Sequence, residues 1–122
     1  MTRRIRGRTE YHAGLAAEDS IARDYERRGF PVARRRWRGR GGEIDLIARD
    51  GEGLIFIEVK KSRDFATAAQ RLGARQMARL CQSAEEFVAG EPRGLLTEMR
   101  FDVALVDAQG RHQIVENAFG AV

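Results

Sequence analysis

The pattern of apolar and polar residues predicts a single sheet flanked by helices. Apolar residues at helical spacing predict helices over about 10–28 and 64–89, and Gly29 stands where the first helix would end. Alternating apolar and polar residues predict five strands, at about 32–38, 43–49, 54–61, 99–106 and 111–116. The order of helix, three strands, helix and two strands predicts an α+β, or mixed α/β, sandwich around one central sheet.

Length and composition fit one ordinary domain. The chain has 122 residues, 43% of them hydrophobic and 33% charged, which is enough apolar material for one core. We expect residues 1–9 to form a flexible basic arm and residues 10–122 to form the domain. Apolar runs of about four residues are too short to span a membrane, so no membrane partner is expected. The single cysteine, Cys81, excludes an internal disulfide, and we expect a reducing, cytoplasmic location.

The positive charge is concentrated at the N-terminal end. Residues 1–40 contain twelve Arg and five acids, a net charge of +7, whereas the other 82 residues carry ten basic and thirteen acidic groups, a net charge of −3. Five of the arginines fall within seven residues: Arg34, Arg35, Arg36, Arg38 and Arg40. Such a cluster favours binding to polyanions such as nucleic acids, because each Arg–phosphate contact releases counterions. A solvated basic surface explains the charge alone equally well.

The segment FIEVKK (56–61) places charges in the most apolar stretch of the chain. Glu58 and Lys60 interrupt what otherwise reads as a buried strand. An unpaired charge in an apolar interior costs several kcal/mol, so both side chains need partners. If this strand pairs with the preceding one around the turn DGEG (50–53), opposed positions sum to 103 and Asp45 lies opposite Glu58. Lys60 then joins the same face of the hairpin, two residues further along.

Two interpretations of this charge cluster are open. Adjacent carboxylates repel each other, so a cation must lie between Asp45 and Glu58 or one of them must be protonated. Lys60 could be that cation in a purely structural cluster. A divalent metal such as Mg²⁺ could also fill the place, since it binds one or two carboxylates and completes its shell with water and substrate phosphate. The only lysines among 22 basic residues are Lys60 and Lys61, which favours a special role for an ammonium group at this point.

A further acid is predicted on the inward side of the first helix. Glu18 lies three residues after Leu15, on the same helical stripe as Tyr25. A structural partner for it could be Tyr25 or an Arg of the neighbouring strand. Near the C-terminus, Arg100 and Asp102 share one face of their strand and are expected to pair with each other.

Five short motifs resemble the YraN family of small bacterial proteins. They are AED around Glu18, GEIDLI (42–47), FIEVK (56–60), RFDV (100–103) and NAF (117–119). The motifs extend over about residues 14–119 and occur in the family's order. The family is similar to archaeal Holliday junction resolvases and belongs to the restriction-endonuclease-like PD-(D/E)xK superfamily. The resemblance implies a central mixed sheet flanked by helices, with the core order αβββαβ.

The resemblance also implies the roles of individual residues. Asp45 takes the place of the motif Asp, and Glu58 and Lys60 take those of the ExK motif. Glu18 matches an acid of the first helix that binds the metal, or its water, in the resolvases. With the Val59 carbonyl, Asp45 and Glu58 would hold Mg²⁺ or Mn²⁺. Lys60 would position or activate the attacking water.

Three departures from the family pattern are visible. Ile44 precedes Asp45 where the literal motif has Pro, as is usual in the related groups. Gln76 stands where many members have Lys, which would weaken a phosphate contact. Ala66 follows Phe65 where the family has Gly, which would alter the loop before the second long helix. None of these changes removes a proposed metal ligand.

The sequence as a whole predicts a metal-dependent endonuclease acting on DNA, including branched or other non-standard structures. The predicted alternation puts Arg34, Arg36 and Arg38 on one face of their strand, beside the site. Together with Arg40, these three would contact phosphates. One alternative is a nucleic-acid-binding module on a nuclease fold with little or no turnover. Another is an interaction protein whose charge cluster is structural. Resolvase-like proteins often dimerise to place two sites on a junction, so the resemblance allows a homodimer.

Overall fold

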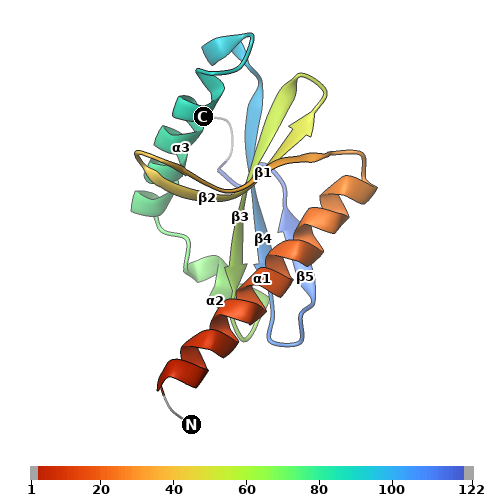
Figure 1. Cartoon of the computed structure of the whole chain (residues 1–122), viewed down its shortest axis with the longest axis vertical. Helices are drawn as coiled ribbons and strands as arrows, with labels where there is room; N and C mark the ends of the chain where they lie inside the picture. Colours follow the sequence, from red (N-terminus) through yellow and green to blue (C-terminus); the bar gives the residue numbers. More distant parts are fainter. Residues whose placement is uncertain (1–2, 120–122) are drawn as a thin grey trace.

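The computed structural model describes residues 3–119, and the side chains from residue 14 onward. A five-stranded sheet in the order β1-β2-β3-β4-β5 forms its centre (Figure 1). The strands are β1 (Val32–Gly39), β2 (Gly42–Asp50), β3 (Gly53–Lys61), β4 (Met99–Val106) and β5 (His112–Val115). The helices are α1 (Arg3–Arg27), α2 (Phe65–Gln70) and α3 (Ala74–Val88), with a short 3₁₀ turn at Gly94–Leu96.

The sheet is mixed, which confirms the predicted fold class. Strands β3 and β4 run parallel, and the other neighbouring pairs are antiparallel. A parallel pair needs a crossover connection, and α2 and α3 provide it. The elements follow the predicted order, except that the second helix is in two pieces. The predicted fifth strand is β5, at the edge of the sheet and beyond the αβββαβ core. All five strand boundaries lie within one residue of those predicted from alternation.

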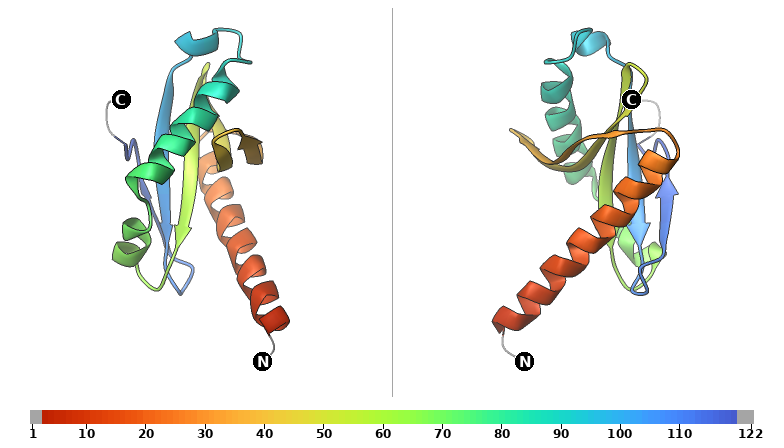
Figure 2. Two further views of the ribbon diagram at one scale, coloured as in Figure 1. Left: turned by 90° about the vertical axis from the view of Figure 1, so that its left-hand side faces the viewer. Right: turned by 45° about the vertical axis from the view of Figure 1, so that its right-hand side comes forward.

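The helices cover opposite faces of the sheet, giving three layers (Figure 2). On the α1 side, Ile21 and Tyr25 pack with strand residues such as Leu46 and Ile57. The α3 side has its own apolar cluster, in which Leu80, Ala84 and Val88 of α3 meet four buried strand residues, Ile44, Ile47, Leu54 and Phe56. Because both faces are buried, β2 and β3 read as nearly continuous apolar runs, and any charge within them is conspicuous.

Helix α1 ends as predicted and begins earlier than predicted. The amide of Phe30 donates to the Tyr25 carbonyl and that of Gly29 to the Glu26 carbonyl, while Gly29 has a φ of 91°. This is a Schellman cap, which needs a residue that tolerates left-handed backbone. The helix starts at Arg3, so residues 3–9, predicted to be a loose arm, are helical, as the good helix propensity of Arg allows. Residues 1–2 and the side chains of the arm lie outside the described residues.

The second predicted helix, 64–89, is divided, which the apolar spacing did not indicate. Asp64 caps α2 by accepting a hydrogen bond from the Thr67 amide at 2.7 Å. Gly73 then adopts an extended conformation (φ −93°, ψ 166°) and becomes the N-cap of α3, without a side-chain cap. Gly favours such a break because its backbone is the most costly to fix in a helix. None of the helices described in the structure is both long and apolar enough to cross a membrane.

The turn between β1 and β2 is fastened to α3. The Ser83 hydroxyl donates to the Gly42 carbonyl at 2.9 Å, and the Arg40 amide donates to a Glu86 carboxylate oxygen at 2.7 Å. A Cβ atom at Gly41 would lie 2.3 Å from the Arg79 carbonyl oxygen, so only Gly permits this approach. These contacts hold the β1–β2 turn beside α3, as Figure 1 shows.

Candidate active site on strands β2 and β3

The predicted register of the β2–β3 hairpin is confirmed over five pairs, but the predicted pairing of Asp45 with Glu58 is not among them. The observed partners run from Asp50–Gly53 to Leu46–Ile57, and each pair sums to 103. Regular pairing stops one position before Asp45 and Glu58. Beyond that point the Asp45 carboxylate itself accepts a hydrogen bond from the Val59 amide at 2.8 Å, so a side chain replaces the backbone partner.

The backbone is irregular at Asp45. Ile44 and Ile47 both pack on the α3 side, while Leu46 packs on the α1 side. Residues three apart in a regular strand point to opposite faces, so the alternation breaks between Ile44 and Leu46. On the neighbouring strand, Arg36 has a φ of 51°, an uncommon conformation for a residue with a side chain. The irregularity gives Asp45 an orientation that regular alternation does not provide.

Glu58 is a buried carboxylate with too few partners. Its exposed fraction is 7%. One carboxylate oxygen, Oε1, lies 3.5 Å from Lys60 Nζ and 3.4 Å from Gln76 Nε2, both long distances for such contacts. The other oxygen, Oε2, is buried, and no donor of the described part of the chain reaches it. Burial raises the pKa of Glu58 to about 8, and two effects of the adjacent Asp45 carboxylate add to this rise: its negative charge and its hydrogen bond with the protonated Glu58 carboxyl group. Lys60 opposes the rise.

Glu18 lies near these residues and is held by an arginine. Its two carboxylate oxygens accept from Arg36 Nε at 3.1 Å and from Arg36 Nη2 at 2.7 Å. Burial and the charge of Asp45 raise the pKa of Glu18, while the bond to Arg36 lowers it. Among residues 14–119, whose side chains the structure describes, no three His, Cys, Asp or Glu side chains are close enough together to hold a metal. The site as described therefore joins Asp45, Glu58 and Lys60, with Glu18 engaged elsewhere.

The arginines of β1 do not form a simple row. The register shifts between Val32 and Arg34, and the left-handed backbone at Arg36 interrupts the alternation again. As a result, two consecutive side chains both reach α1: Arg35 pairs with Asp19, and Arg36 pairs with Glu18. The single arginine face assumed from strict alternation is therefore disturbed at its centre.

The flanking β1 arginines make weaker contacts. Arg34 donates to the carbonyl of its neighbour Ala33 at 3.3 Å. Arg38 lies 3.7 Å from Glu43, with 74% of its side chain exposed. Arg40 contributes its backbone amide to the contact with α3. Trp37 packs edge-on against Phe87, with ring centres 5.2 Å apart.

Gln76 connects the site to a surface cleft that sequence analysis missed. The cleft has a volume of about 450 Å³ and lies between the β1–β2 turn and the start of α3. Gln76 lines it while its amide contacts Glu58. Three arginines also line it, Arg71, Arg75 and Arg79. The sequence pattern that could have indicated a basic surface here is the four-residue spacing of Arg75 and Arg79, which puts both on the side of the helix opposite its apolar stripe.

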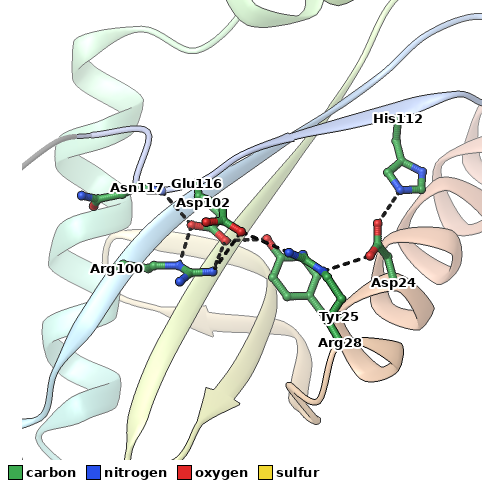
Figure 3. A network of polar contacts seen from close by, with 8 residues as sticks. All are labelled: Asp24, Tyr25, Arg28, Arg100, Asp102, His112, Glu116 and Asn117. Atoms are coloured by element: carbon green, nitrogen blue, oxygen red, sulfur yellow. Dashed lines mark hydrogen bonds and ion pairs between the residues drawn. The ribbon is translucent and has the colours of Figure 1, made fainter.

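A second polar cluster lies on the other face of the sheet, around Asp102 (Figure 3). Asp102 is 1% exposed. It accepts from the Tyr25 hydroxyl at 2.6 Å, from Arg100 Nε at 3.0 Å and from the Asn117 amide at 2.9 Å. The predicted Arg100–Asp102 pair is thus confirmed, and Tyr25 bonds Asp102 rather than Glu18. Burial and the bond to Asp102 raise the pKa of the Tyr25 hydroxyl, which stays protonated as the donor.

Comparison with known proteins gives a consistent family relationship. The model of the family described as "Uncharacterised protein family UPF0102" matches residues 17–106. A UPF0102 protein of Ruegeria pomeroyi is 67% identical over 94% of this chain and 94% of its own length. Another, of Cereibacter sphaeroides, is 64% identical over 94% of this chain and 98% of its own. A third, of Dinoroseobacter shibae, is 42% identical over 94% of this chain and 86% of its own.

Proposed function

Because the chain belongs to the UPF0102 family and brings Asp45, Glu58 and Lys60 together on one sheet, we propose that it is a metal-dependent nuclease that hydrolyses phosphodiester bonds in DNA. The proposal includes a place in the restriction-endonuclease-like PD-(D/E)xK superfamily, which the order of helices and strands supports. It also agrees with the resemblance of the sequence motifs to the YraN family.

The observation that carries the proposal is the unpaired Oε2 of Glu58. A buried polar atom without a partner costs about 1–3 kcal/mol, and more when charged. A structural carboxylate would not be expected to keep such a cost, since most buried polar groups find partners. A divalent cation between Glu58 and Asp45 would supply the missing partner and remove the repulsion that raises the pKa of Glu58.

The donor set fits Mg²⁺ or Mn²⁺. Two carboxylates and the Val59 carbonyl are hard oxygen ligands, and Mg²⁺ typically uses one or two carboxylates and leaves the remaining positions to water and phosphate oxygens. Glu18 would act through a water, or as a ligand after releasing Arg36. When bound, the ion would stabilise the negative charge that develops on the attacked phosphate.

The side chains of the site have separate tasks in this proposal. Asp45 is fixed by the Val59 amide, so its free oxygen keeps one direction. Glu58 must lose its proton to become a ligand. Lys60, with 18% of its side chain exposed, is accessible enough to donate to the attacking water or to a phosphate oxygen. By analogy with the nucleases that the sequence resembles, in-line attack would leave a 5′-phosphate and a 3′-hydroxyl.

One observation favours a second candidate, a nucleic-acid-binding module without turnover. Glu18 is bonded to Arg36 at both oxygens, so the described side chains offer the ion two carboxylates rather than three. If Arg36 does not release Glu18 when DNA binds, metal affinity would be low and cleavage slow. The two candidates differ in cleavage and share DNA binding.

A cleavage assay separates them. Linear, single-stranded, flapped and four-way DNA would be incubated with the protein and Mg²⁺ or Mn²⁺, beside Asp45→Asn and Lys60→Ala proteins purified identically. We expect the wild type to cut at least one substrate and both variants to lose that activity. An Asp50→Asn protein, changed at an exposed acid of the same strand, is the matched control and should cut normally. Cutting that survives at Asp45→Asn and Lys60→Ala would refute this site.

A further inference from the structure

The arginines that line the cleft beside α3 differ from those of β1 in their partners. Arg71, Arg75 and Arg79 are exposed, and none of their guanidinium groups forms a hydrogen bond or ion pair with another described residue. On β1, by contrast, Arg35 and Arg36 are paired with acids of α1. A guanidinium that is already paired offers less to a phosphate, because its partner must first be displaced.

The lining of the cleft, with a volume of about 450 Å³, suits a polyanion. One side is formed by Gly41 and Gly42, which lack side chains and so allow close approach to the backbone. Arg75 and Arg79 lie on the other side, one helical turn and about 5–6 Å apart. Among the described residues that line the cleft, one is acidic, Glu43, which lies 3.7 Å from Arg38.

Gln76 joins the cleft to the site on β2 and β3. It belongs to the lining of the cleft, and its amide nitrogen lies 3.4 Å from Glu58 Oε1. A strand lying along the cleft would therefore be separated from Glu58 by a single side chain at the Gln76 end. The β1 strand is joined to the site differently, through the Arg36–Glu18 pair.

We propose that the cleft lined by Arg71, Arg75 and Arg79, rather than the arginines of β1, binds the DNA backbone next to the bond that is cut. The binding of a DNA strand by these three guanidinium groups does not depend on catalysis. The position of that strand next to the bond that is cut rests on the proposed function. The arginines act as phosphate contacts, which position the strand and carry no base preference.

Binding of a fluorescent single-stranded DNA, measured by anisotropy in EDTA over a series of salt concentrations, tests the inference without any cleavage. The triple variant Arg71→Gln/Arg75→Gln/Arg79→Gln should bind at least about tenfold more weakly at low salt. The slope of log affinity against log salt should fall by about 2 units, since each lost phosphate contact on a single strand removes about 0.7. The matched control is Arg23→Gln/Arg27→Gln, two exposed helix arginines with the same spacing, on α1, which should keep the slope.

A change at Gly73 separates loss of binding from loss of folding. A Cβ atom there would meet nothing within 4 Å, and Gly73 is the N-cap of α3. Both Gly73→Asp and Gly73→Ser add a capping side chain and should keep or slightly raise stability. Only Gly73→Asp puts a negative charge in the cleft, so only this variant should bind DNA more weakly, by several-fold.

The outcomes distinguish this inference from the proposed nuclease activity. Binding that depends on the three cleft arginines, in a protein that never cuts DNA, would support the cleft and refute the nuclease. Cutting by the wild type with normal binding and cutting by the triple variant would refute the cleft and leave the nuclease standing. An equal loss of slope in the α1 control, a loss only when Arg34, Arg35 and Arg38 are replaced, or no DNA binding by the wild type would each overturn the cleft.

Discussion

Glu58 and Asp102 are buried carboxylates on neighbouring strands, but they differ in the hydrogen-bond donors that surround them. Asp102, on the α1 face, receives hydrogen bonds from a hydroxyl, a guanidinium and a backbone amide, from 2.6 to 3.2 Å (Figure 3). Glu58, on the α3 face, has two contacts of 3.4 and 3.5 Å and an oxygen with no partner in the described chain. Both are less than 10% exposed. Burial alone therefore does not distinguish a structural acid from a functional one, and the difference lies in the donors.

The comparison separates two uses of a buried charge. Around Asp102, fixed donors join α1, β4 and the segment after β5, so the charge links distant parts of the fold. Around Glu58, no donor reaches Oε2, so the buried carboxylate costs stability, and in the proposed function a cation would supply the missing partner. Functional sites are often kept at such a cost.

The largest effect is expected at Asp102. Asp102→Asn removes the charge that Arg100 and Tyr25 are bonded to and should lower the free energy of unfolding by about 3 kcal/mol, because one partner of a buried pair is left uncompensated. Urea unfolding measures this, with the exposed Asp50→Asn as control. A loss below about 1 kcal/mol would show that the Asp102 cluster is not the structural counterpart described above.

Replacing Glu58 is expected to maintain or raise the free energy of unfolding, whereas replacing Asp102 lowers it. The folded pKa of Glu58, about 8, lies above its ordinary value of 4.5, so between these values the folded protein retains a proton that the unfolded chain releases. The free energy of unfolding should therefore fall as pH rises from about 5 to 8, by up to about 1.4 kcal/mol per pH unit. Glu58→Gln should flatten this dependence and be at least as stable as the wild type at pH 8. Urea unfolding at pH 5, 6.5 and 8 measures both. Equal slopes in the two proteins would mean that Glu58 is not the titrating group.

The smallest effect is expected at the rim of the Asp102 cluster. Asp24 accepts from His112 Nε2 at 2.7 Å and pairs with Arg28 at 3.1 Å. Burial opposes ionisation, but the bond to His112 and the charge of Arg28 hold the pKa of Asp24 below its ordinary value. Its stabilisation is present above that value and lost as pH falls through the acid range. Asp24→Asn should cost about 1 kcal/mol at pH 7 and make acid unfolding less steep. A cost equal to that of Asp102→Asn would erase the distinction between centre and rim.

The elements and the hairpin register followed from local sequence. The short DGEG turn between two apolar runs fixes which residues of β2 and β3 lie opposite each other, so the sum of 103 could be predicted from Asp50–Gly53 to Leu46–Ile57. Gly29 likewise marked the end of α1 through its backbone freedom. Gly73 has the same freedom, yet it lies inside a helical pattern, where a single Gly does not by itself predict a break.

The remaining features could not be predicted, because they depend on backbone geometry and on long-range contacts that the spacing of residues in the sequence does not reveal. The left-handed backbone at Arg36 and the irregularity at Asp45 rotate side chains away from the faces that alternation assigns, and they bring Arg36 to Glu18. The partners of Asp102 come from α1 and from the segment after β5, more than 70 positions apart for Tyr25. The cleft arginines look like ordinary surface charges until the β1–β2 turn is seen to pack against α3 at Gly41.

The most direct test of this account is calorimetric titration of Mn²⁺ into the protein at pH 7, in two buffers with different heats of ionisation. We predict one site and the release of nearly one proton per ion bound, because Glu58 holds a proton at this pH and must lose it to become a ligand. Asp45→Asn and Glu58→Gln should abolish the binding, and Asp50→Asn should preserve it. Binding that persists unchanged in Asp45→Asn and Glu58→Gln, or no binding by the wild type, would contradict the claim that these two carboxylates form a metal site.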